Sequence, residues 1–184
     1  DAAGRVNKQT EHATLYTLST VPTFPDLQTW ATGNVSASDR ITRTVYDAAG
    51  EPRYIVDAEG FVTEKQYLYG QLTKDIRYPA AVSVSDGVTL TGMAALLPGT
   101  PPSTAAVTQY AYDSVGRLTG VTDAEGVVTH NVYNVLGQLT DVTQAYGTTD
   151  AATTHYVYDV VGQVSSAAMG YGAAEVSTTV YTYD

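Results

Sequence analysis

The sequence predicts an all-β protein in which stacked antiparallel hairpins form a curved or spiralling strip of sheet, open at both ends. Composition is the first observation, because 15 Tyr occur against two Phe and one Trp, and Thr and Val are also abundant. These residues favour strands, and Gly and Asp favour the turns between strands. The second observation is a recurring Tyr-Asp-x-x-Gly motif. The third is an alternation of apolar and polar residues between its copies, which is the period of a half-buried strand.

The clearest copies of the repeat begin at Tyr46 and Tyr112. Each runs through an Asp-x-x-Gly turn, a short alternating segment and an Asp-Ala-Glu-Gly turn, and ends with the same spacing at Tyr67 or Tyr133. Asp at the first position of such a turn can accept a backbone N–H, and Gly at the last can adopt positive φ. Each repeat is therefore predicted to form two short antiparallel strands. A lone hairpin is marginal in water, so neighbouring repeats must pair. Weaker or partial copies begin at Asp1, Tyr69, Tyr133 and Tyr158.

The Tyr that opens each repeat is predicted to occupy a similar environment in every hairpin. Paired strands would bring its ring against aromatic and β-branched side chains of the next strand. We interpret these residues as inner-face packing rather than as a stack that binds a ligand. They are Tyr46, Tyr67, Tyr112, Tyr133, Tyr158 and Tyr183.

A longer, 66-residue period relates the two best copies, since the same spacing separates Tyr46 from Tyr112 and one Asp-Ala-Glu-Gly turn from the other. We therefore predict a single array over residues 1–184 that is built on a duplicated larger unit.

Two irregular stretches interrupt this array, at about residues 19–40 and 79–105, and both contain Pro and Gly. They are predicted to be elongated loops or weakly paired edge segments, with one helical turn possible at residues 93–97. Exposed loops on a rigid repeat are common places for binding, but we interpret these two stretches as tolerated insertions in preference to binding loops.

The pattern Tyr-Asp-x-x-Gly-Arg-Leu-x-x-Val-x-Asp-x-x-Gly, carried by residues 112–126, resembles the YD repeats of Rhs proteins. The same repeats occur in the C components of bacterial toxin complexes and in animal teneurins. The resemblance implies a long sheet that spirals into a hollow shell. In bacteria this shell often encloses a C-terminal toxin, and in teneurins it supports cell-surface adhesion.

The chain departs from that family in three respects. It has far fewer repeats than a shell needs, and it lacks both the C-terminal Rhs region, with its aspartate-dependent self-cleavage motif, and a variable toxin domain. Its first and last residues also fall at repeat seams, which leaves open strand edges. We infer an excerpt of a longer YD-repeat array, or a chain that joins further copies edge to edge.

No catalytic, cofactor-binding or metal-binding residues are expected, and the chain is not expected to be an enzyme. It has no Cys, and His12, His130 and His155 form no metal-ligand motif. No nucleophile elbow or phosphate-binding loop occurs. The carboxylates of the two Asp-Ala-Glu-Gly turns, at 57–60 and 123–126, offer calcium ligands, although turn geometry alone explains them. A glycosylation sequon at residues 34–36 matters only in a eukaryotic secretory pathway.

The net charge of −10 and the pI of about 4.5 argue against a nucleic-acid partner. No apolar run approaches the ~20 residues of a membrane span, and the first residues do not resemble a secretion signal. Two functions follow. One is a structural segment of a larger, secreted bacterial Rhs-type protein whose shell encloses a toxin cargo. The alternative is an extracellular adhesin or fibre assembled by edge-to-edge strand pairing at the cell surface.

Overall fold

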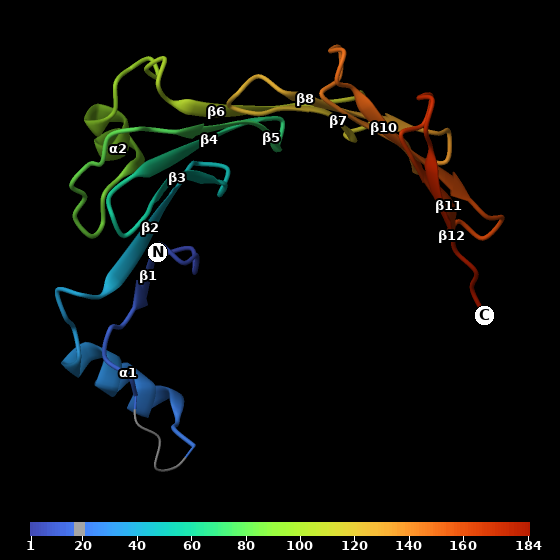
Figure 1. The fold of residues 1–184 in the computed structure, drawn as a ribbon. Coiled ribbons are helices and arrows are strands. Elements are labelled where there is room, and N and C mark those ends of the chain that lie inside the picture. Colours follow the sequence, from blue (N-terminus) through green and yellow to red (C-terminus); the bar gives the residue numbers. More distant parts are fainter. Residues whose placement is uncertain (17–20) are drawn as a thin grey trace. The chain divides into compact units, whose positions relative to one another are not determined.

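The computed structural model describes residues 1–16 and 21–184, so the first two residues of the predicted insertion at 19–40 lie outside it. The described residues form twelve strands and two helices (Figure 1). The strands are β1 (Lys8–Glu11), β2 (Arg40–Tyr46), β3 (Pro52–Val56), β4 (Val62–Leu68), β5 (Gln71–Arg77), β6 (Ala106–Tyr112), β7 (Leu118–Thr122), β8 (Val128–Tyr133), β9 (Leu139–Gln144), β10 (Ala152–Tyr158), β11 (Val164–Met169) and β12 (Ser177–Val180). The helices are α1 (Phe24–Gly33) and α2 (Leu90–Leu96).

The described strands belong to one unclosed sheet whose order in space follows their order in the sequence. Each strand pairs antiparallel with its neighbour, as the registers from β1 to β4 and from β6 to β12 record. The prediction of stacked antiparallel hairpins in an open sheet is therefore confirmed. The 66-residue period reappears as strand spacing, because β2, β3 and β4 precede β6, β7 and β8 by that interval.

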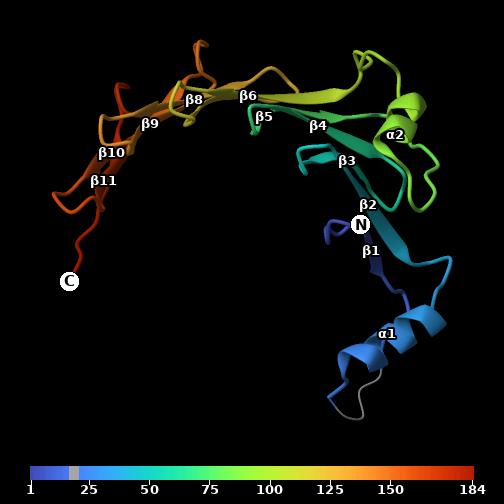
Figure 2. The ribbon, with the colours of Figure 1, turned by 180° about the vertical axis from the view of Figure 1, so that it is seen from behind.

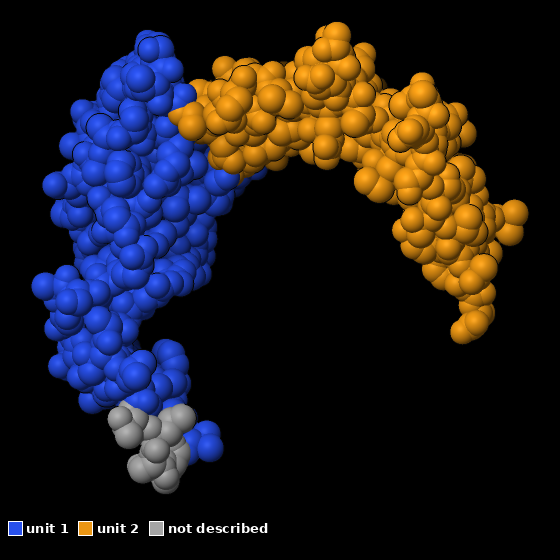
Figure 3. Space-filling view, in the orientation of Figure 1, with its two compact units in different colours: residues 1–65, 77–105 blue, residues 66–76, 106–184 orange. Residues whose placement is uncertain are grey.

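The chain divides into two compact units (Figure 3). Unit 1 comprises residues 1–65 and 77–105, and unit 2 comprises residues 66–76 and 106–184. The two units differ in how they bury side chains. Within the described part of the chain, residues 106–184 contain no fully buried side chain, so their strands form a sheet without a core. The buried apolar side chains of unit 1 are Val45, Tyr54, Val56, Val62, Tyr78 and Met93.

The second insertion supplies part of the core of unit 1. The N-cap of α2 is Thr89, whose hydroxyl accepts the Gly92 N–H at 3.1 Å. The helix, labelled α2 in Figure 2, lies against β3. Its residue Met93 is fully buried. Pairing also extends past β5, since the Val82 N–H donates to the Gly60 carbonyl at 2.9 Å. The predicted loop with a turn at 93–97 was thus wrong in part, because a helix begins earlier, at Leu90, and covers the sheet.

The first insertion contains α1, which the sequence prediction missed. Its N-cap Thr23 and Asp26 form a capping box, in which the Thr23 N–H donates to the Asp26 carboxylate at 2.9 Å. Pro25 lies in the first turn, where a missing N–H costs nothing. The two N-caps, Thr23 and Thr89, are separated by one full 66-residue period, so both insertions carry a helix at the same position of the larger unit. The Pro and Gly content suggested a loop and obscured this capping signal.

Replacing Met93 by Ala is expected to lower the free energy of unfolding of unit 1 by about 2–5 kcal/mol, because it leaves a cavity under α2. Chemical denaturation followed by circular dichroism measures this loss. Leu96→Ala is the matched control, since Leu96 lies on the same helix but is 47% exposed. Equal losses for the two variants would contradict the assigned core position of Met93.

Candidate functional site: the links between repeats

The Asp-x-x-Gly turns share one geometry throughout the described chain. The Gly N–H donates to the carbonyl of the first residue at 3.0–3.2 Å. The side-chain Oδ1 of the first residue accepts the N–H groups two and four positions later, at 2.8–3.1 Å. Each Gly has a φ between 76° and 90°, which a residue with a Cβ rarely adopts. The predicted roles of Asp and Gly are confirmed. These turns span residues 1–4, 47–50, 57–60, 113–116, 123–126, 134–137 and 159–162.

The strand pairs that end in a Tyr-Asp or Tyr-Asn turn also shift register by one residue at the Tyr. A turn followed by a positive-φ Gly and a one-residue shift is the three-residue hairpin loop with a bulge. The Asp side chain thus satisfies the amides that the bulge removes from the ladder.

The Tyr before each such turn links its hairpin to the one before. Its hydroxyl donates to a backbone carbonyl of the preceding strand or the residue leading into it, at 2.7–3.0 Å. The residues linked in this way include five of the predicted Tyr. None of the five is fully buried, and Tyr183 is 51% exposed. The pairs are Tyr46 with Val6, Tyr112 with Leu72, Tyr133 with Leu118, Tyr158 with Leu139, and Tyr183 with Val164.

The predicted packing role of these Tyr is therefore incomplete. Their rings are half-buried or exposed on the sheet, while their hydroxyls hold one hairpin to the next. Tyr67, the remaining predicted member, is half-buried near the end of β4.

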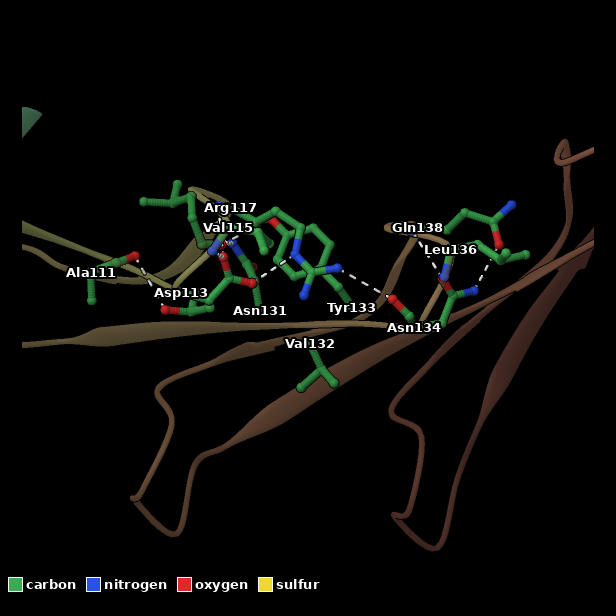
Figure 4. A network of polar contacts seen from close by, with 12 residues as sticks. Ala111, Asp113, Val115, Arg117, Asn131, Val132, Tyr133, Asn134, Leu136 and Gln138 are labelled. Carbon is green, nitrogen blue, oxygen red and sulfur yellow. Dashed lines mark hydrogen bonds and ion pairs between the residues drawn. The ribbon is translucent and has the colours of Figure 1, made fainter. Parts of the chain in front are cut away.

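Arg117 connects the turns at residues 113–116 and 134–137, which lie on the same side of unit 2 (Figure 4). Its Nε donates to Asp113 Oδ2 at 2.7 Å, and its guanidinium carbon lies 4.9 Å from the centre of the Tyr133 ring. Its Nη1 donates to the Asn134 carbonyl at 3.3 Å. The hydroxyl of the same Tyr133 donates to Leu118, the residue after Arg117. A continuous network therefore connects Asp113, Arg117 and Tyr133.

The network has a second charged copy and an uncharged copy. In unit 1, Arg5 pairs with Asp1 at 2.6 Å and lies 4.4 Å from the Tyr46 ring centre. In unit 2, Asn134 takes the place of Asp, and its Nδ2 donates to Gln138 Oε1 at 2.7 Å. A pair of side-chain amides can thus replace the ion pair. The side-chain oxygen at the first turn position still accepts the backbone N–H groups of the turn.

These contacts change the pKa of the Asp113 carboxyl group. The backbone N–H of Arg117 and then its guanidinium hold the pKa of Asp113 below its usual value. The charged form is therefore the form that the fold stabilises.

The comparisons with known proteins agree with this geometry. Residues 102–128 and 112–149 match the model of the RHS repeat. Residues 102–149 are therefore similar to RHS repeats. The comparison with curated proteins gave no match.

Several solved structures share the fold of this chain over its whole length. They include the crystal structures of TcdB2-TccC3-Cdc42 (19% identity, TM-score 0.68) and of TcdB2-TccC3 without its hypervariable C-terminal region (21%, 0.68). A third is TcdB2-TccC3-TEV (20%, 0.69). Each match covers 100% of this chain and 8% of the other chain, so this chain spans a small part of their length.

The two Asp-Ala-Glu-Gly turns use the carboxylate of their Asp to accept backbone N–H groups. Oδ1 of Asp57 and of Asp123 each accepts two amides, and Asp57 Oδ2 pairs with Arg77 at 2.6 Å. Within residues 1–16 and 21–184, no group of three or more His, Asp or Glu side chains has the proximity of a metal site. Turn geometry thus accounts for these Asp residues.

A buried ionic cluster lies in unit 1, and the sequence analysis did not find it. Glu64 is 6% exposed, and its carboxylate accepts hydrogen bonds from Arg53 at 2.7 Å and from the Tyr78 hydroxyl at 2.6 Å. Burial and then the interaction with Glu64 raise the pKa of Tyr78 well above its usual range. These partners supply the charge and the hydrogen bonds that a buried carboxylate requires. Neither the turn motif nor the alternation of β4 indicates it.

The three His lie apart from one another. His12 lies 3.0 Å from Asp39 in unit 1. In unit 2, His130 stacks on Tyr146 at 4.4 Å and His155 on Tyr171 at 4.3 Å. The step from His130 to His155 equals the step from Tyr146 to Tyr171, so the two stacked pairs occupy equivalent positions of consecutive repeats.

The sequence analysis missed this shorter-range equivalence, although Thr-His-x-Val-Tyr at residues 129–133 and 154–158 signals it. Of the helices in the described part of the chain, none has the length and apolar character needed to cross a membrane.

Asp113→Asn is expected to lower stability at pH 7 and to have a smaller effect at about pH 2. The folded-state pKa of Asp113 is lowered, so its contribution is present above the unfolded-state pKa of about 4 and is lost as pH falls through the folded value. The side-chain oxygen of Asn still accepts the two backbone N–H groups, as Asn134 demonstrates. Urea midpoints at the two pH values measure the effect.

Asp150→Asn serves as the control, because Asp150 is exposed and should change neither midpoint. A deficit for Asp113→Asn that is the same at both pH values would show that the ion pair with Arg117 contributes nothing.

Proposed function

We propose that this chain is a structural segment of a larger, exported bacterial Rhs-type protein, and that its sheet forms part of a wall around a toxin cargo. The observation that carries the proposal is the repeated link between hairpins, in which backbone, Tyr hydroxyl and turn carboxylate join each hairpin to the next. A wall needs continuity along its whole length, and this network supports that continuity where residues 106–184 have no buried core.

The likeness to the TcdB2-TccC3 structures supports the same proposal, since it extends over the whole chain. We further propose that the segment catalyses no reaction. The buried Glu64 carboxylate and the Asp113 carboxylate are both engaged with Arg side chains, which suits a scaffold.

Limited proteolysis of the complete protein that contains these repeats tests whether they enclose a cargo. The region proposed as cargo is expected to resist a non-specific protease in the native protein. The same region expressed alone is the matched control and should be cut at the same protease concentration.

Resistance should disappear in urea that opens the repeats before the cargo itself unfolds. A cargo region that is cut equally fast in the native protein and in isolation would overturn the proposed wall.

A further inference from the structure

Helix α1 of unit 1 is largely exposed. It has ten residues and none is buried, and only Trp30 and Ala31 are half-buried. A helix of this length is marginal in water, because most helices in proteins are stabilised by packing an apolar face. The capping box of α1 fixes where the helix begins but supplies no such packing. Within the part of the chain that the structure describes, α1 therefore lacks a surface that buries it.

The 66-residue period identifies the apolar face of α1. It places Phe24 at the position of Leu90, and Leu27 at the position of Met93. Residues three apart lie on one face of a helix, so the two helices present the same face. On α2, which lies against β3, Met93 is 0% exposed and Leu90 is 39% exposed. On α1, Leu27 is 40% exposed and Phe24 is 77% exposed. The face that α2 buries is thus uncovered on α1.

The strand under α2 indicates the partner that this face requires. Tyr54 and Val56 of β3 are 6% and 2% exposed. One period later, β7 carries Gly120 and Thr122 at these positions, and residues 106–184 contain no helix. The backbone does not demand Gly120, since an added Cβ would meet the Ala111 Cβ at 3.5 Å, which is an ordinary contact. Large apolar side chains therefore accompany a covering helix, and small or polar ones occur without it.

The free edge of β1 gives the place of this partner. β1 is the first strand of the sheet and corresponds to β5, since Gly4 and Gly70 lie one period apart. β5 lies beside β4, and the chain after β5 stays paired with β4, because the Tyr78 N–H donates to the Val62 carbonyl at 2.9 Å. Helix α2 thus follows a strand that is paired with the repeat it covers. A repeat placed on the edge of β1 would stand in the same relation to α1.

We propose that α1 covers a further repeat of the same kind as β2, β3 and β4. This repeat pairs with the free edge of β1 as β4 pairs with β5, and it carries large apolar side chains at the positions of Tyr54 and Val56. Leu27 is buried against it as Met93 is buried in unit 1. The inference rests on the proposed function in one respect, which is that the chain is a segment of a longer array. It does not depend on whether the sheet encloses a cargo.

Thiol labelling of Leu27→Cys with iodoacetamide tests this contact, because the chain contains no Cys. The rate is measured in residues 1–184 and in a chain extended by a second copy of residues 40–66 before Asp1, which keeps the 66-residue spacing. The extension should slow labelling by about tenfold or more, since a buried thiol reacts only when the helix opens. Thr29→Cys, on the opposite and exposed side of α1, is the matched control and should react equally fast in both chains.

An extension made from residues 106–132 separates the helix contact from strand pairing. It has the same length and register as the copy of residues 40–66, but it carries Gly120 and Thr122 instead of large apolar side chains. Leu27→Cys should therefore stay as reactive as in residues 1–184. Hydrogen exchange of the β1 amides measures pairing in both extended chains. Protection of Leu27→Cys by both extensions, or by neither when β1 is paired, would overturn the proposal.

The complete protein that contains these repeats provides a test that needs no extension. In it, Leu27→Cys should be labelled as slowly as Met93→Cys, as read by peptide mass spectrometry. Labelling as fast as in residues 1–184 would overturn the proposal. Protection in residues 1–184 alone that increases with protein concentration would also overturn it and assign α1 to a second copy. The cargo region plays no part in these measurements, so their failure differs from a failure of the protease test.

Discussion

The hydrogen bond from a repeat Tyr hydroxyl to a carbonyl of the preceding hairpin is the interaction on which the rest of unit 2 depends. Strand pairing alone leaves a thin sheet free to slip, because a register shift costs little where neither face is buried. Each Tyr removes that freedom, since its ring length fixes which carbonyl the hydroxyl can reach. The same contact recurs at Tyr112, Tyr133 and Tyr158 at 2.7–3.0 Å, so every hairpin of unit 2 from β6 to β11 is placed by its predecessor.

The Asp or Asn side chain of each turn gives the Tyr contact the same geometry in successive hairpins. An Asp or Asn that accepts two amides fixes the bulge, and the bulge determines where the preceding Tyr projects. Arg117 adds charge to this arrangement by joining Asp113 to the Tyr133 ring. Where Gln138 replaces Arg, the geometry persists on neutral hydrogen bonds alone. The repeat thus tolerates variation in its charges but retains an Asx residue, a Gly and a Tyr.

Local chemistry made the hairpins predictable. Asp-x-x-Gly determines a turn from four consecutive residues, and alternation determines the strands on either side. The contacts that join hairpins were beyond sequence reasoning, because the Tyr112 hydroxyl donates to Leu72 across the whole second insertion. Burial of Glu64 was missed for the same reason, since Tyr78, its buried partner, follows a different strand.

The two helices were missed for a different reason. Thr23 and Thr89 cap them from equivalent positions of the 66-residue unit, and this signal is weak beside the surrounding Pro and Gly. Insertion and repeat therefore have distinct roles. In unit 1 the second insertion supplies Met93 to a buried core, whereas the repeats of unit 2 rely on links between hairpins.

Native-state hydrogen exchange of Tyr133→Phe tests whether the Tyr hydroxyl holds one hairpin to the preceding one. The variant removes one hydroxyl and leaves the ring, and Tyr69→Phe removes a hydroxyl from an almost fully exposed side chain as the control. We expect the free energy of opening between β7 and β8 to fall by about 1 kcal/mol in Tyr133→Phe and to stay unchanged in Tyr69→Phe. Unchanged exchange between β7 and β8 in Tyr133→Phe would contradict it.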